Sequence, residues 1–90
     1  IGAFALQETT TGIFNTALGT FSGNTITTGN QNTLLGHGAN PSAADAINQI
    51  VIGYNAVGAG NNSLQLGNTS VTNVNIKLQE NKILIVIKTD

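Results

Sequence analysis

The chain has 90 residues, a formal net charge of −1 and only 8% charged residues, where ordinary globular domains carry roughly 25%. This balance excludes a basic surface for nucleic acid and a polybasic signal for anionic lipid. No stretch approaches the roughly 20 apolar residues of a membrane-spanning helix, so we expect no membrane insertion by this segment. The lack of cysteine excludes disulfides and thiolate metal sites.

A short motif recurs through residues 1–70 and ends in a glycine each time. Its copies are Asn15-Thr16-Ala17-Leu18-Gly19, Asn32-Thr33-Leu34-Leu35-Gly36, Asn48-Gln49-Ile50-Val51-Ile52-Gly53 and Asn62-Ser63-Leu64-Gln65-Leu66-Gly67, after an Ile1-Gly2 that matches the tail of an earlier copy. The glycines stand 17 residues apart, and the last pair 14 apart. This period predicts a solenoid of short stacked strands. Because the chain begins within a repeat, we expect it to be a fragment of a longer protein.

Counting from the closing glycine gives columns of equivalent residues. The residue before it is always a large aliphatic, and we predict that these side chains form an internal ladder with the glycines at a corner: Leu18, Leu35, Ile52 and Leu66 with Gly19, Gly36, Gly53 and Gly67. Side chains alternate along a strand, so the residue at −2 is expected to point outward. That outward column is largely apolar, which predicts a second chain as its cover.

The remaining segments read as loops and a C-terminal cap. Variable stretches follow Leu6, Gly23 and Asn40, and we expect the longer ones to bulge from the solenoid and to carry surface contacts. Residues 74–78 alternate apolar and polar side chains, and residues 83–87 are continuously aliphatic, which predicts two strands of a hairpin. We therefore divide the chain into a repeat domain, 1–74, and a strand-turn-strand cap, 75–90.

The repeats resemble the Asn-Ser-Val-Ala-Ile-Gly motif of YadA-like head domains of trimeric autotransporter adhesins. The resemblance rests on Asn62 to Gly67 and its upstream copies, each followed after two residues by Ala or Ser, and covers about residues 1–74. It implies an all-β, left-handed parallel β-roll, three copies of which are intertwined or packed side by side as a homotrimer. Similar repeats occur in phage-type tail fibres. The 17-residue intervals exceed the common family unit of about 14, and the C-terminal segment lacks the heptads of a coiled-coil stalk.

Few residues suggest chemistry. The four acids do not recur in the repeat and form no evident pair, so we predict no enzyme, no cofactor and no metal site. The single histidine, His37, is expected at the surface or at an interface, with three copies around an ion on a threefold axis as the weaker alternative. Repeated Asn residues are expected to satisfy turn backbone groups in a stacked ladder. Phe4 and Phe21 share a column and are expected to pack, which leaves Tyr54 as the best candidate for a surface contact.

The functional expectation is a non-enzymatic structural and adhesive module. We predict a trimeric surface adhesin or fibre segment, located outside the cell, that presents a multivalent surface to a host protein or glycan. A receptor-binding segment of a phage-type tail fibre, on a virion, is the alternative from another class. An ice-binding solenoid is a third hypothesis, because Thr9 to Thr11 and Thr25 to Thr28 form threonine-rich loops on a chain of low charge.

Overall fold

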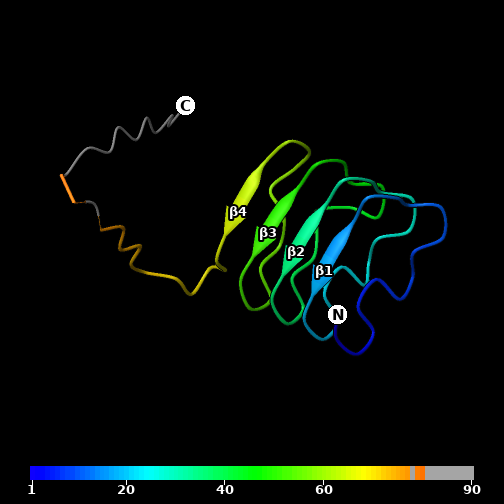
Figure 1. Ribbon diagram of the computed structural model, residues 1–90, viewed down its shortest axis with the longest axis horizontal. Coiled ribbons are helices and arrows are strands. Elements are labelled where there is room, and N and C mark those ends of the chain that lie inside the picture. The colour runs from blue at the N-terminus through cyan, green and yellow to red at the C-terminus, as the bar shows by residue number, and fades with distance from the viewer. Residues whose placement is uncertain (78, 81–90) are drawn as a thin grey trace.

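The computed structural model describes residues 1–77, 79 and 80, and within them the chain is all-β without a helix. Four strands of three residues each form one sheet in chain order: β1 (Thr16–Leu18), β2 (Thr33–Leu35), β3 (Ile50–Ile52) and β4 (Leu64–Leu66) (Figure 1). Every neighbouring pair is parallel. We call each chain turn that ends in a closing glycine a coil, and the stack of coils the roll.

The strand register reproduces the columns of the sequence. Leu18 pairs with Leu35, Leu35 with Ile52 and Ile52 with Leu66, so a step from coil to coil covers 17, 17 and then 14 residues. The N-terminal residues already belong to a coil, because the Gly19 N–H donates to the Ile1 carbonyl at 2.7 Å. The all-β class and the parallel stacking of the repeats are confirmed.

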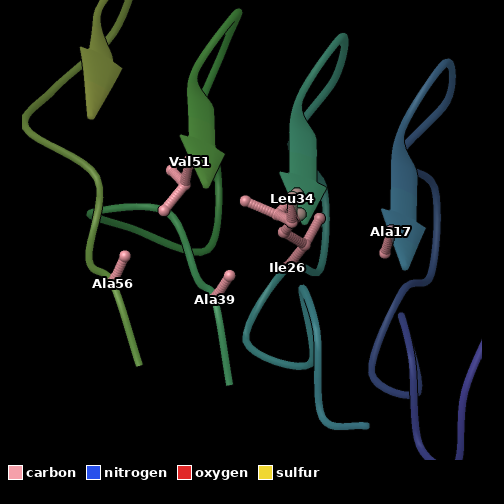
Figure 2. Close-up of a cluster of buried hydrophobic side chains, with 6 residues drawn as sticks. All are labelled: Ala17, Ile26, Leu34, Ala39, Val51 and Ala56. Atoms are coloured by element: carbon pink, nitrogen blue, oxygen red, sulfur yellow. The ribbon is translucent and has the colours of Figure 1, made fainter. Parts of the chain in front are cut away.

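The predicted direction of the side chains is wrong. The −2 residues face the interior, with Ala17, Leu34 and Val51 all buried, while Leu18, Leu35 and Leu66 lie 40–56% exposed on the opposite face and Ile52 is half-buried. The interior is narrow: opposite the −2 side chains stand small buried residues of the +3 column, Ser22, Ala39 and Ala56. Strands β1, β2 and β3 therefore bury one side chain each within the chain (Figure 2), whereas the central Gln65 of β4 is half-buried.

Two buried amide side chains favour the inward direction of the −2 residues. Asn32 and Gln49 are four residues before a closing glycine, share the −2 side of the strand and are fully buried. The Asn32 Nδ2 donates to Asn15 Oδ1 at 3.0 Å and to the Ala46 carbonyl at 2.8 Å, and its Oδ1 accepts the Gln49 N–H at 3.0 Å. If the −1 residues pointed inward, Asn32 and Gln49 would point outward. The buried backbone groups to which Asn32 is hydrogen-bonded would then lose their partner.

The predicted asparagine ladder is in fact two ladders. Asn15 and Asn32 form the interior one with Gln49. Asn48 and Asn62 lie one residue earlier in their coils, where they are exposed and joined by a 3.0 Å hydrogen bond from Nδ2 to Oδ1. Both adopt positive φ, 54° and 61°, a conformation that asparagine tolerates better than most residues. The predicted role of asparagine in satisfying turn backbone is confirmed for the interior ladder.

The closing glycines form the predicted corner. Gly19 and Gly36 have φ values of 129° and 130°, which side chains disfavour. A Cβ on Gly36 would stand 2.7 Å from the Gly53 carbonyl oxygen in the next coil. Glycine is thus required both for the backbone conformation and for the distance between coils.

The 17-residue coils carry loops that stack instead of bulging independently. The Thr10 N–H donates to the Thr27 carbonyl at 2.9 Å, and the Thr27 N–H donates to the Ala44 carbonyl at 3.0 Å. Ile26, in the second of these loops, is fully buried in the core beside Leu34 (Figure 2). Ile26 therefore adds to the core from its loop, and the backbone hydrogen bonds between the loops correct the expectation that they bulge.

The segment after the last coil does not form the first cap strand in the described residues. Residues 71–77 belong to no strand and are exposed, and they run away from the β4 end of the roll (Figure 1). A lone alternating segment has no hydrogen-bonding partner, and isolated strands are not stable in water. The second predicted strand, 83–87, lies outside the described residues, and the boundary at 74 stays a prediction.

Candidate binding surfaces

The outer face of the sheet is a regular surface of the roll. We define it by the outward residues of the four strands: Thr16, Leu18, Thr33, Leu35, Ile50, Ile52, Leu64 and Leu66. Six of the eight are aliphatic and none is charged. Apart from Ile52, which is half-buried, all are exposed in the single chain. Exposed apolar patches larger than a few hundred Å² commonly mark interaction sites on protein surfaces.

The parallel register arranges the outer face in two straight columns. Directly paired residues sit beside one another along the roll, so the −1 column is an aliphatic ladder from Leu18 to Leu66. The −3 column begins with two threonines and continues with Ile50 and Leu64. The predicted ladder thus exists, but it lies on the outer face of the sheet and not in the interior.

A row of four rings follows the corner after the outer face. The ring centroids of Phe4 and Phe21 are 5.0 Å apart and nearly parallel, Phe21 meets His37 edge to face at 6.0 Å, and His37 stacks on Tyr54 at 5.5 Å. We call these residues the aromatic row. All four are exposed, Tyr54 at 63%. The predicted packing of Phe4 with Phe21 is confirmed.

The sequence analysis missed the continuation of the row. His37 and Tyr54 come one residue after their glycines, whereas Phe4 and Phe21 come two residues after theirs. A strict column alignment separates the two pairs. The usable signal was an aromatic ring within two residues of each of the first four closing glycines. Asn68 takes this place in the last coil, and its Nδ2 donates to the Tyr54 carbonyl at 2.7 Å.

The aromatic row presents mainly ring edges. Stacked rings cover each other's faces, so a ligand that stacks on an open aromatic face finds little room between Phe4 and Phe21. The ring edges form a narrow, largely apolar strip with two polar groups, the imidazole of His37 and the hydroxyl of Tyr54. This surface suits packing against another apolar surface. Tyr54, at the end of the row, keeps its place as the candidate surface contact.

The described residues hold no group of three or more His, Cys, Asp or Glu that could bind a metal ion. In the part of the chain that the structure describes, His37 contacts the rings of Phe21 and Tyr54. The alternative of three His37 side chains around an ion requires other copies and stays a prediction.

The threonine-rich loops use part of their hydrogen-bonding capacity within the roll. The Thr9 and Thr10 hydroxyls donate to the carbonyls of Ile26 and Thr27 in the next coil at 3.4 and 3.2 Å. In the third coil the equivalent loop carries Ala44. The threonines of these loops therefore form no array along the whole roll. Ice binding stays a prediction without further support.

In the described part of the chain, no helix has the length and apolar character needed to cross a membrane. Comparison of the chain with protein-family models, with curated proteins and with solved structures gave no match.

Proposed function

We propose that this chain is a structural and adhesive module whose copies associate through the outer face of the sheet. The observation that carries the proposal is the uncharged aliphatic surface of β1–β4, with Leu18 and Leu66 about half exposed. Burial of apolar area contributes roughly 25 cal/mol per Å², so such a surface is stabilised by contact with another like it.

The number of copies and the biological setting come from the resemblance of the repeats to YadA-like heads. On this proposal three left-handed rolls pack side by side as a homotrimer of a surface adhesin or fibre, outside the cell. The variable loops and Tyr54 then face outward toward a host protein or glycan. Three linked copies present each weak contact three times, and linkage raises the effective concentration of the second and third contacts.

The proposal is tested by the mass in solution, measured by light scattering. We expect about three times the 9.2 kDa of one chain. The variant Leu35→Lys places a charge in the centre of the outer face and should reduce the mass to that of one chain, because an unpaired buried charge is costly.

The matched control is Thr28→Lys, which adds the same charge at an exposed loop position away from the sheet. It should leave the mass unchanged. A native chain that stays at 9.2 kDa across a wide concentration range would overturn the proposed association, and with it the multivalent mechanism.

A further inference from the structure

Phe14 is a strongly exposed aromatic residue in a backbone conformation that suits it poorly. Its φ is 61°, in a region that bulky residues disfavour, and its side chain is 77% exposed. The ring contacts of the described residues are those of the aromatic row, and Phe14 takes part in none of them. Ring stacking within the chain therefore compensates neither the backbone conformation of Phe14 nor the exposure of its ring.

The fold does not require a phenylalanine at this position. The equivalent residues of the later coils, five before the closing glycine, are Gln31, Asn48 and Asn62, with φ values of 63°, 54° and 61°. The conformation thus belongs to this corner of every coil, and the later coils fill it with polar residues. A residue held in a disfavoured conformation is grounds for a functional hypothesis. We therefore looked for a surface that the ring of Phe14 could contact.

Phe14 and the aromatic row lie at opposite margins of the outer face. All four strands run in the same direction, so their first residues share one margin and their last residues share the other (Figure 1). Phe14 comes two residues before β1, and Phe21 comes three residues after it. We call these sides the N-terminal margin and the C-terminal margin. At the level of β1 each margin carries an exposed phenylalanine.

The outer face alone is too small for a stable interface. It contributes eight side chains, whereas a standard interface engages roughly 20–30 residues on each side. Copies that associate through this face must therefore also bury its margins. Uncharged apolar side chains are available on both: Ile13 and Phe14 are 55% and 77% exposed on the N-terminal margin, and Phe4 and Phe21 are 52% and 38% exposed on the C-terminal margin.

Rotational symmetry decides which margins meet. In the proposed side-by-side trimer, the copies are related by rotation about an axis along the roll. Such a rotation preserves the direction in which the strands circulate around the axis, so the N-terminal margin of each copy meets the C-terminal margin of the next. An interface of this kind joins two different patches of the same chain. With the coils at the same height, Phe14 of one copy comes to the level of Phe21 of the next.

We infer that Phe14 is the anchor by which each copy binds the next, with its ring packed on the Phe4–Phe21 end of the aromatic row. The row presents ring edges there, and the uncovered ring face of Phe14 is a favourable partner for an edge. Buried aromatic anchors commonly contribute much of the binding energy of an interface. The inference rests on the proposed association through the outer face and names a second contact of that association.

The variant Phe14→Asn tests the anchor with two measurements of opposite sign. Asparagine tolerates the positive φ, so the unfolding midpoint of the dissociated chain should stay unchanged or rise. The association constant, measured by sedimentation equilibrium, should fall by about tenfold or more. Val57→Asn makes a similar apolar-to-polar change at a 61% exposed loop residue outside both margins. This control should leave the association constant unchanged.

A double-mutant cycle tests the partner of the ring. The loss of association for Phe14→Asn with Phe21→Asn should be smaller than the sum of the two single losses, because both variants remove the same contact. Phe14→Asn with Tyr54→Asn is the control. Tyr54 follows β3, two strands further along the roll, about 10 Å away, so these losses should add. Additive losses in both pairs would overturn the contact with Phe21.

Cysteine cross-linking tests the meeting of unlike margins, since the chain has no cysteine of its own. Phe14→Cys with Phe21→Cys should oxidise to disulfides between chains. Within one chain β1 separates the two positions, and its three residues alone span about 7 Å, so the two Cα atoms lie beyond the separation that a disulfide accepts. Each single variant is a control. As much cross-linking in either single variant as in the double variant would overturn the pairing of unlike margins.

The outcomes separate this inference from the proposed function on which it rests. A native chain that stays at 9.2 kDa at every concentration would overturn both. A native chain that associates, with Phe14→Asn associating equally well, would overturn the anchor and leave the association through the outer face intact.

Discussion

The two faces of the same four strands differ more than their sequences suggest. Leu34 and Leu35 are adjacent residues of the same type, yet Leu34 is 1% exposed and Leu35 is 40% exposed. Leu34 packs inside the roll against small residues such as Ala39, whereas Leu35 belongs to the outer face. The comparison teaches that an aliphatic residue at a repeated strand position does not by itself indicate which of two adjacent side chains is buried within the chain.

The largest expected effect comes from removing the inner leucine. Leu34→Ala should lower the free energy of unfolding by about 2–5 kcal/mol, because it removes buried methyl groups and leaves a cavity. The loss should be the same at every protein concentration. Urea unfolding followed by circular dichroism measures it.

The adjacent outer leucine is the matched control. Leu35→Ala should cost about 1 kcal/mol or less in dilute protein, since the side chain keeps much of its contact with water. If copies cover the outer face, the cost should grow with protein concentration. A larger, concentration-independent loss for Leu35→Ala than for Leu34→Ala would contradict the assignment of the two faces.

Asn32 in the interior and Asn48 at the surface allow a second comparison, with smaller expected changes in stability. Asn32→Ala should destabilise the chain by about 1–3 kcal/mol, because the buried Gln49 N–H and Ala46 carbonyl lose a partner. Asn48→Gly removes an exposed amide while still accepting the positive φ, and should change stability by no more than about 0.5 kcal/mol. Equal effects in thermal unfolding would show that the interior ladder is not needed to satisfy the loops.

The period of the repeat was sufficient to predict the stacking of parallel strands, but it did not predict which side chains of each strand point inward. The interval between closing glycines predicted the pairs Leu18 with Leu35 and Ile52 with Leu66, because parallel stacking places equivalent residues side by side. Whether the −1 or the −2 residues point inward depends on the side chains that face the strand from the other side of the coil. The informative signal was the recurrence of Asn32 and Gln49 on the −2 side. Amide side chains can hydrogen-bond the buried backbone groups of the turns in a narrow coil.

Contacts between residues that occupy different positions of the repeat could not be predicted from the aligned columns either. Ile26 lies in a variable stretch without a counterpart in the 14-residue coil, so alignment on glycines gave no reason to place it in the core. The aromatic row changes column between Phe21 and His37, and only the stacking of coils brings the two rings to 6.0 Å. Local shifts of one residue are tolerated because a large ring can reach across the corner.

The smallest expected effect separates ring stacking from backbone strain. Phe14 and Phe21 both have a φ of 61°, a region that bulky residues disfavour. Phe21 contacts two rings, Phe4 and His37, whereas no ring contact joins Phe14 to the described residues. Asparagine tolerates this φ, so replacing either residue by Asn relieves strain, and only Phe21→Asn also removes stacking.

Phe21→Asn should therefore destabilise the chain by about 1 kcal/mol, since each aromatic pair contributes roughly 0.5–1.5 kcal/mol. Phe14→Asn should be neutral or slightly stabilising. The difference between their unfolding midpoints isolates the contribution of the row, because both substitutions make the same chemical change at the same backbone conformation. If Phe21→Asn is as harmless as Phe14→Asn, the row adds nothing to the stability of the single chain, and its regular spacing then has to be explained by a surface packed against it.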